Sequence, residues 1–330
     1  MSVHVVSYNL LVPILAEEPG YFYKCHPKYI DRNYRFGFIQ SELQREISRH
    51  KNAIICLQEL CRTTIPLFNE FFRQQNYRLI HKSYGEKFND YMGVGIAIPN
   101  SMRSASAAFI KVSDKIKARL SQKATDSLSI LSRFRQYLRD KSSRGTSDPW
   151  DIAMNKKNIL IFIRVMIHGV PLCIGTYHMP CLYKFPDVML IHATMVKDLM
   201  FELARGDNMI LAGDFNMQPT ANCYRAITEL GCTSCQLPKS KIYEVYYRPD
   251  ANHILRSAYV EKNGIEPPFT AFSSTPNSPD FCAPMDYIFF YGRLLVNNVL
   301  RLPNYPDSES YPDATHPSDH LMIAATFRLG

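Results

Sequence analysis

The sequence predicts a mixed α/β or α+β protein that is built in layers. Apolar residues make up 46% of the 330 residues, which is enough for a sizeable core and argues against wholesale disorder. Short apolar runs that are typical of buried strands recur along the chain. Some of these runs follow one another closely, as in hairpins, and others are separated by segments with helical spacing. No internal repeat is visible, so one large two-sheet architecture can absorb the whole length.

Helices are expected where apolar residues recur every three or four positions. Residues 34–50 show this spacing at Phe36, Ile39, Leu43 and Ile47. The predicted helices are residues 34–50, 66–75, 187–204 and about 219–230.

Strands are expected at the apolar runs. The predicted strands are residues 3–9, 53–57, 93–98, 158–167, 170–177, 208–211, 285–290 and 321–328. His168 and Gly169 join two of them as a two-residue hairpin turn, so His168 is given no chemical role. Residues 232–279 are rich in Pro, Ser, Asn and Tyr, which indicates loops and short strands.

A basic segment at about residues 101–150 predicts an insert that is largely helical. Residues 111–144 carry ten Lys and Arg against three Asp, which is +7 of the net charge of +8. Two interpretations are open: a solvated surface helix, or an electrostatic arm for a polyanion. In the second, Arg133, Arg135 and Arg139 contact the phosphates of single-stranded RNA.

The cysteines and the N-terminal residues indicate an intracellular protein. Nine cysteines are scattered without a framework, and Cys232 and Cys235 have CxxC spacing without a second pair, so unpaired thiols are predicted. Residues 3–15 are too short and too interrupted for a signal peptide or a membrane span. We therefore expect reduced thiols, a cytoplasmic or nuclear location and no membrane contact.

Polar side chains follow apolar strand runs at several separate points of the chain. These residues are Asn9, Glu59, His178, Asp214, Asn216, Asp286, Asp319 and His320. Strand ends of a sheet protein converge on one rim, which is a usual place for an active site. Glu59 directly follows a buried run, where a carboxylate costs free energy unless it is paired or bound to a metal.

These residue types suit hydrolysis of a phosphodiester. Asp214 and Asn216 are two residues apart, so in an extended chain they face one side, and Asp214 could deprotonate a water that Asn216 positions. An ordinary Asp/Asn turn after a strand is the alternative. Glu59 and Asp319 are hard oxygen donors suited to Mg²⁺ or Mn²⁺. A metal, a water-activating Asp and a cationic His are the parts that the attack needs.

Six segments, in chain order, resemble those of the endonuclease–exonuclease–phosphatase superfamily: SYNLL, CLQEL, TYHMP, AGDFNMQP, MDYIFF and HPSDH. They extend from Asn9 to His320. The chain is most similar to the branch of poly(A) deadenylases, nocturnin and 2′-phosphodiesterases. Leu11 stands where abasic-site endonucleases usually have an Asp, which counts against the DNA-repair branch.

The resemblance implies a four-layer α/β sandwich, with two mixed sheets face to face and helices outside. Residues 1–330 would form one catalytic domain that carries the basic insert. Glu59 would be the main Mg²⁺ ligand with Asn9 beside it, and Asp319 would serve a second metal or its water shell.

The resemblance also assigns roles in the reaction. Asp214 would orient or deprotonate the attacking water, and Asn216 would hold phosphate or water. His320, oriented by Asp286, would contact the non-bridging phosphate oxygens, although a buried Asp often does no more than satisfy a His. His178 would stabilise the charge of the transition state.

The expected function is Mg²⁺-dependent hydrolysis of RNA from the 3′ end with poly(A) preference. Phe281 falls near the position of a deadenylase aromatic and would stack on a terminal base, or else is a core or loop residue. The alternatives are a 2′-phosphodiesterase or nucleotide 2′-phosphatase, a lipid or inositol phosphate phosphatase, and a binding protein with a dead site. No leucine-rich-repeat region precedes Met1, so we expect no scaffold recruitment by that route.

Overall fold

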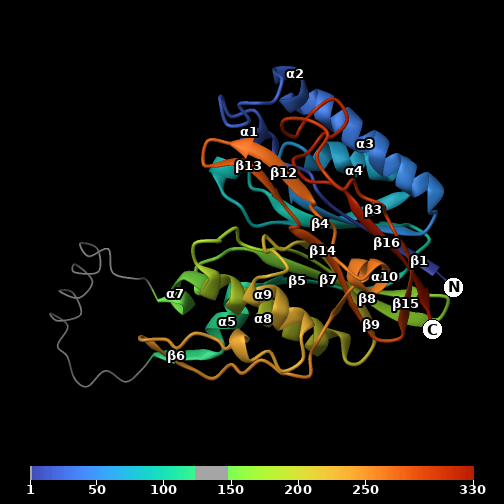
Figure 1. Cartoon of the computed structure of the whole chain (residues 1–330). Coiled ribbons are helices and arrows are strands. Elements are labelled where there is room, and N and C mark those ends of the chain that lie inside the picture. Colours follow the sequence, from blue (N-terminus) through green and yellow to red (C-terminus); the bar gives the residue numbers. More distant parts are fainter. Residues whose placement is uncertain (1, 123–147) are drawn as a thin grey trace.

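Two six-stranded mixed sheets dominate the computed structural model, which describes residues 2–122 and 148–330 (Figure 1). The first sheet has the order β15 (Leu294–Val299), β16 (Ile323–Leu329), β1 (Ser2–Asn9), β2 (Ala53–Leu60), β4 (Gly93–Pro99), β3 (Tyr77–Ser83). The second has the order β11 (Arg256–Ser257), β14 (Asp286–Tyr291), β9 (Asn208–Asp214), β8 (Val170–His178), β7 (Ile159–Ile167), β5 (Ser104–Lys111). Two short ribbons pair β10 (Tyr243–Val245) with β6 (Leu120–Gln122) and β12 (Ala271–Thr275) with β13 (Ser278–Ala283).

Helices cover the outer faces of both sheets. The helices are α1 (Pro13–Ala16), α2 (Pro27–Ile30), α3 (Arg32–Arg49), α4 (Ile65–Gln74), α5 (Val112–Lys117), α7 (Pro149–Met154), α8 (Pro186–Ala204), α9 (Asn222–Thr228) and α10 (Ala258–Asn263), with 3₁₀ turns η1 (Lys87–Asn89) and η2 (Thr233–Cys235). α3 and α4 lie against the first sheet, and α8 with α9 lies against the second (Figure 1).

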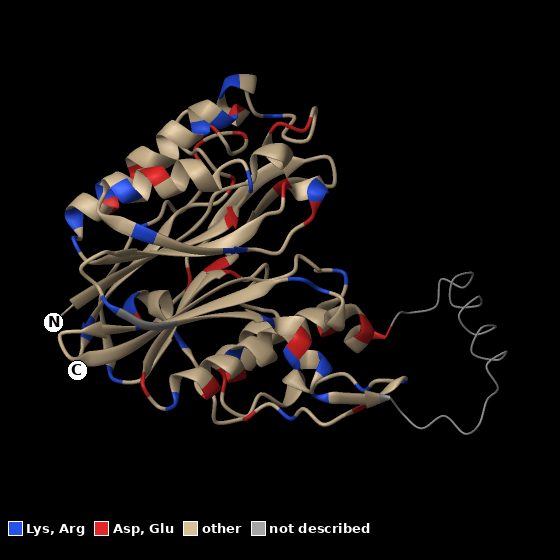
Figure 2. Ribbon diagram, turned by 180° about the vertical axis from the view of Figure 1, so that it is seen from behind, with Lys and Arg blue, Asp and Glu red and all other residues tan. Residues whose placement is uncertain are grey.

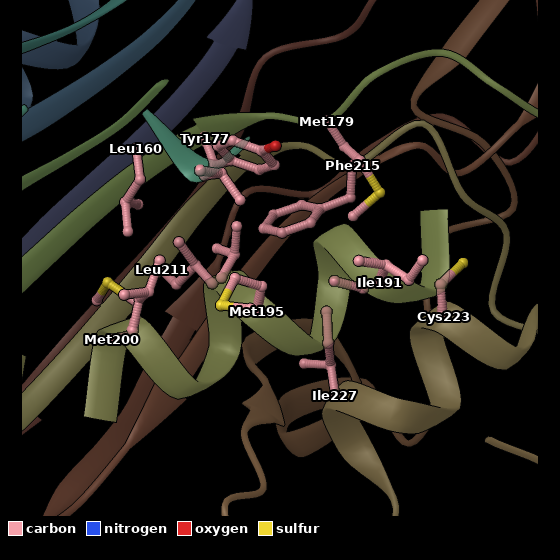
Figure 3. Packing of buried hydrophobic residues seen from close by; sticks show 14 of the residues in the cluster. Leu160, Tyr177, Met179, Ile191, Met195, Met200, Leu211, Phe215, Cys223 and Ile227 are labelled. Atoms are coloured by element: carbon pink, nitrogen blue, oxygen red, sulfur yellow. The ribbon is translucent and has the colours of Figure 1, made fainter. Parts of the chain in front are cut away.

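Three apolar layers hold this arrangement together. Between the sheets, Val5 and Ile96 of the first pack with Ile174 and Ile210 of the second. Leu43 of α3 belongs to a second cluster, outside the first sheet. The third cluster fills the space between the second sheet, α8 and α9, and Figure 3 shows its sulfur-containing and aliphatic side chains around α8. The predicted four-layer sandwich is therefore confirmed.

Local signals in the sequence account for the two long helices. Asp31 caps α3 by accepting hydrogen bonds from two backbone N–H groups of its first turn. α8 starts at Pro186, whose fixed φ and missing N–H suit a first helical position. Most of α8 is buried because it lies between the sheet and a further helix.

Within the described part of the predicted insert at residues 101–150, helix is found at α5 and at the start of α7, whereas β5 and β6 are strands. Ser104–Lys111 forms β5, the edge strand that pairs antiparallel with β7 in the second sheet. Ala108 and Ile110 pack on the core while Phe109 is exposed, so a short period-2 pattern was hidden by the neighbouring charges. The predicted RNA contacts Arg133, Arg135 and Arg139 lie outside the described residues.

Several smaller predictions need correction. β3, β13 and β15 were missed because each is an edge or hairpin strand with many polar residues. The helix expected at about 219–230 begins only at Asn222. Cys232 and Cys235, predicted to be unpaired, form a disulfide. Within residues 2–122 and 148–330, no helix combines the length and the hydropathy that a membrane span requires.

Replacing Gly213 with alanine should destabilise the protein, because the backbones of β8 and β9 approach closely there. A Cβ on Gly213 would lie 1.9 Å from the Tyr177 carbonyl oxygen, and a paired strand cannot move aside. We expect a loss of at least about 1–3 kcal/mol in the free energy of unfolding, measured by chemical denaturation. Gly37→Ala is the matched control: it has open space on the exposed face of α3 and should stabilise the helix by about 0.5–1 kcal/mol. If Gly213→Ala left the denaturation midpoint unchanged, the close approach of the β8 and β9 backbones would be contradicted.

Candidate active site

Strand register brings the polar strand ends of both sheets to one rim. In the second sheet, His178 of β8 and Asp286 of β14 both stand opposite Asp214 of β9. In the first sheet, Asn9 ends β1 and stands opposite Gln58 of β2. Charged residues elsewhere lie mainly on the outer helices and loops (Figure 2).

Asn9 joins the two sheets at this rim. Its buried Nδ2 donates to Asp214 Oδ2 at 2.9 Å and to Glu59 Oε1 at 3.2 Å. Its Oδ1 accepts from the backbone N–H of Leu11 at 3.0 Å. The amide thus turns its nitrogen, and not its oxygen, toward the two carboxylates, which is the geometry of a donor that holds them together.

Glu59 is placed by a β-bulge and not by a plain strand end. The pairing of β2 with β4 shifts register between Gln58 and Leu60, so Glu59 has no partner in the ladder. Its φ is +62°, a left-handed conformation that is uncommon for a residue with a Cβ. The bulge redirects the carboxylate to the rim, where Val12 N–H donates to Oε2 at 2.7 Å.

Asp319 lies on the loop before β16 and faces the Glu59 region. The pKa of Asp319 is raised to about 6, because burial and the neighbouring Glu59 carboxylate together outweigh the opposing charges of His320 and Arg35. Arg35 of α3 is itself buried and donates to the carbonyls of Leu10, Leu11 and Pro317. This single guanidinium therefore fixes the loop after β1 against the loop before β16.

His320 is held by Asp286. Nδ1 of His320 lies 2.8 Å from Asp286 Oδ2, which also accepts from Thr270 Oγ1 at 2.7 Å. Burial disfavours the imidazolium of His320, but the carboxylates of Asp286, Asp214 and Asp319 outweigh it and raise the pKa well above the usual value. Nε2 lies 3.8 Å from Asp214 Oδ2, so a cationic ring faces the centre of the site.

His178 approaches Asp214 from the other side. Nε2 of His178 lies 3.4 Å from Asp214 Oδ2, and Nδ1 lies 2.8 Å from the hydroxyl of Tyr84. Asn158 Nδ2 donates to the backbone carbonyl of His178 at 2.7 Å. The two histidines and Asn9 thus surround one oxygen of Asp214.

Asn216 lies on a turn and not on an extended segment. Its φ is +48°, and its backbone N–H donates to Asp214 Oδ1 at 2.8 Å. Its Nδ2 donates to the Met179 carbonyl at 2.9 Å. The neighbouring Phe215 points into the core around α8 (Figure 3), so both residues that follow Asp214 anchor the turn.

Phe281 lies apart from the Asp214 cluster, on the β12–β13 ribbon. Its side chain is half-buried and packs against Ala271, Ala283 and Met285. Ala271 forms a bridge with His320, so this ribbon borders the site.

The residues present fit a hard divalent cation. Glu59 and Asp319 are carboxylates close enough for one to raise the pKa of the other, and a cation relieves such repulsion. The ligand atoms of Asp214, Asp286 and His320 lie within 4.8 Å of one another, which is close enough for these three side chains to share a metal ion.

Sequence reasoning missed Tyr84, Thr270, Ser318 and Arg35. Each acts through a residue that is distant in the chain, and none carries a local signal. Ser318 Oγ donates to the Asn9 carbonyl at 2.8 Å, across 309 positions.

Comparisons with known proteins agree with this geometry. A family model described as the Endonuclease/Exonuclease/phosphatase family matches residues 36–320. Nocturnin of Drosophila melanogaster is 22% identical over 350 residues, which cover 99% of the chain and 47% of that protein. The CCR4-Not complex 3′-5′-exoribonuclease subunit Ccr4 of Debaryomyces hansenii is 22% identical over 98% of the chain and 39% of its own length. The chain thus spans about half or less of these curated relatives.

Solved structures share the fold. ANGEL2, a 2′,3′-cyclic phosphatase solved with adenosine-2′,3′-vanadate, has a TM-score of 0.70 at 19% identity, with 100% of this chain and 96% of that chain covered. The human nocturnin catalytic domain with bound sulfate has a TM-score of 0.63 at 17% identity, with 100% and 95% covered.

Glu59→Gln should weaken the binding of Mg²⁺, because the amide removes the negative charge that attracts the cation. We expect the dissociation constant from calorimetric titration to rise by at least about tenfold. Glu70→Gln is the matched control, since Glu70 pairs with Arg73 on the exposed face of α4. Equal Mg²⁺ affinity in the Glu59 variant and the control would exclude Glu59 as a ligand.

Proposed function

Because the chain belongs to the endonuclease/exonuclease/phosphatase family, we propose that it is a Mg²⁺-dependent phosphodiesterase that removes nucleotides from the 3′ end of single-stranded RNA, with a preference for poly(A). The family resemblance inferred from six sequence segments is confirmed by the family model, and its deadenylase and nocturnin branch is supported by the curated relatives.

One observation carries the proposal: a buried carboxylate surrounded by three nitrogen donors beside two further carboxylates. Asp214 Oδ2 accepts a hydrogen bond from Asn9 Nδ2 and faces the Nε2 atoms of His178 and His320. Glu59 and Asp319 lie on the adjoining loops. A site of this kind provides a base, two groups that stabilise charge and a pair of metal-binding carboxylates. Phosphodiester hydrolysis requires these roles.

The roles follow from these positions. Asp214 accepts the proton of the attacking water, and the backbone N–H of Asn216 fixes the orientation of its carboxylate. His320 carries a positive charge toward the phosphate and is kept in place by Asp286. His178 donates a hydrogen bond to a phosphate oxygen. Glu59 and Asp319 would hold Mg²⁺, with Asn9 orienting Glu59, and the cation would polarise a phosphoryl oxygen.

A cavity beside the Glu59 loop supports a substrate longer than one nucleotide. It has a volume of about 350 Å³ and is lined by Pro13, Arg62, Lys87 and Tyr91, among others. Pro13 directly follows Val12, the residue that holds Glu59. Three cations (Arg32, Arg62 and Lys87) and one carboxylate (Asp90) line it, so its lining has a net positive charge. This charge and the exposed ring of Tyr91 are suited to a phosphate and a base of single-stranded RNA.

A second candidate is hydrolysis at a ribose 2′ position, either of a 2′-linked oligonucleotide or of a nucleotide 2′-phosphate. The similarity to ANGEL2, whose structure holds adenosine-2′,3′-vanadate, favours including a 2′,3′-cyclic phosphate among the substrates tested. A panel of poly(A), mixed RNA, 2′–5′ oligoadenylate, adenosine 2′,3′-cyclic phosphate and abasic DNA with Mg²⁺ separates the candidates. Faster release of AMP from poly(A) than from any other substrate is the expected result.

Asp214→Asn should abolish turnover while the fold is retained, because an amide cannot accept the proton of the water. We expect the rate on poly(A) to fall by about 10²–10⁴-fold. Circular dichroism and the unfolding midpoint check the fold. Asp114→Asn, which alters an exposed ion pair with Lys111, should keep the parental rate. Comparable rates for the two variants would refute the role of Asp214.

Phe281→Ala should lower the rates on poly(A) and on mixed RNA together, because stacking on a ring tolerates any base and is worth about 1–3 kcal/mol. Hydrolysis of adenosine 2′,3′-cyclic phosphate, which has no second base, should change less. If every RNA is cleaved at the parental rate, Phe281 serves only the packing of the β12–β13 ribbon.

A further inference from the structure

Both ring nitrogens of His178 have partners, so the position of its proton decides what the ring can do. Nδ1 lies 2.8 Å from the hydroxyl of Tyr84, and Nε2 lies 3.4 Å from Asp214 Oδ2. A neutral imidazole carries its proton on only one nitrogen, and the hydrogen bond at the other nitrogen selects the tautomer.

The surroundings of Tyr84 make its hydroxyl a donor toward His178. Burial raises the pKa of Tyr84 well above its usual value, and the nearby carboxylates of Glu59 and Asp214 raise it further, so the hydroxyl keeps its proton. The proton of the Tyr84 hydroxyl is therefore available for Nδ1 of His178, which lies 2.8 Å away.

The other side of the ring favours the same tautomer. An ionised Asp214 carboxylate can only accept hydrogen bonds, so a lone pair on Nε2 would face an oxygen lone pair. A proton on Nε2 replaces this repulsion with a hydrogen bond. The donors then run in one direction, from Tyr84 through His178 to Asp214.

A second Tyr–His pair in the core shows the same geometry and serves as an internal reference. The Tyr177 hydroxyl lies 2.8 Å from His192 Nδ1, and His192 Nε2 lies 3.2 Å from the Ala153 carbonyl oxygen. A carbonyl oxygen only accepts, so Nε2 of His192 carries the proton and Tyr177 donates to Nδ1. Burial lowers the pKa of His192 to about 4, which keeps this ring neutral at neutral pH.

We propose that Tyr84 is a positioning residue that holds His178 as the neutral tautomer with its proton on Nε2, directed at Asp214 and at the phosphate. The consequence for hydrolysis rests on the proposed function, whereas the tautomer itself does not. The two histidines of the site then have different roles. His320 contributes a positive charge, whereas His178 contributes a directed hydrogen bond and adds no second positive charge to the site.

The experiment is a long-range ¹H–¹⁵N correlation spectrum of the whole chain with ¹⁵N-labelled histidine at neutral pH. The spectrum of His178→Gln assigns His178 by the signals that disappear, and His192→Gln assigns the reference. The expected wild-type result is that His178 and His192 give the same pattern, with Nδ1 unprotonated and Nε2 protonated. A His178 pattern with Nδ1 protonated, or with both nitrogens protonated, would overturn the proposal, and this test needs no Tyr84 variant.

Tyr84→Phe removes the donor and leaves the ring in place. We expect the His178 signals to shift toward mixed tautomers or the imidazolium, while those of His192 stay unchanged. Tyr177→Phe is the matched control: the His192 signals should shift, while those of His178 stay unchanged. A Tyr84→Phe spectrum identical to wild type would also reject the proposal.

The kinetic readout of Tyr84→Phe separates positioning from binding. We expect kcat on poly(A) to fall by about 10–100-fold with KM little changed, because the substrate still binds but meets a misdirected N–H. A raised KM with unchanged kcat would contradict the proposed role. If the spectra agree with the proposal but the wild-type protein hydrolyses none of the substrates, the proposed function fails and the tautomer assignment stands.

Discussion

The hydrogen bond from Asn9 to Asp214 is the interaction on which the site depends, because it joins the end of β1 in the first sheet directly to the end of β9 in the second. It spans 205 positions of the chain and is fully buried. Deeper between the sheets, Gln58 Nε2 donates to Thr176 Oγ1 at 3.1 Å. Buried polar groups are costly unless they are satisfied, so these two bonds specify how the sheets register against each other. The distance between the Glu59 and Asp214 carboxylates follows from that register.

Three of the nine non-glycine residues that have a positive φ in the described chain lie at the same rim. Leu11, Glu59 and Asn216 all have positive φ without being glycine. Such residues cost about 1–3 kcal/mol each and persist only when their surroundings determine them. Here hydrogen bonds hold these conformations. The backbone N–H groups of Leu11, Val12 and Asn216 donate to the side chains of Asn9, Glu59 and Asp214, respectively. These strained conformations cost stability locally, but they direct the Glu59 and Asp214 side chains to the rim, which regular strands would not do.

The sequence predicted the layers and most of the site, because both leave short-range traces. Apolar runs ending in Asp214 or Glu59 identify a strand end and an unusual carboxylate within a few residues. β5 was misread because its period-2 pattern is brief and runs directly into the basic segment that starts at Lys111, and pairing with β7 stabilises it as a strand. Tyr84 could not be found, since a tyrosine after a strand is an ordinary core residue until its partner, 94 positions away, is known. The bulge at Glu59 likewise depends on pairing with β4 and has no local signature.

The pairing of β1 with β16 bears on when this site can form as the chain folds. Ser2 stands opposite Arg328, so the first sheet needs both strands before its centre is complete. Closing so long a loop is entropically costly and slow, and contacts of this sequence separation delay folding. Asp319 and His320 lie just before β16 and reach the rim only when that strand docks. A nascent chain on the ribosome therefore carries Asp214 and Glu59 without a finished site, and the protein gains its chemistry only after residue 329 has emerged.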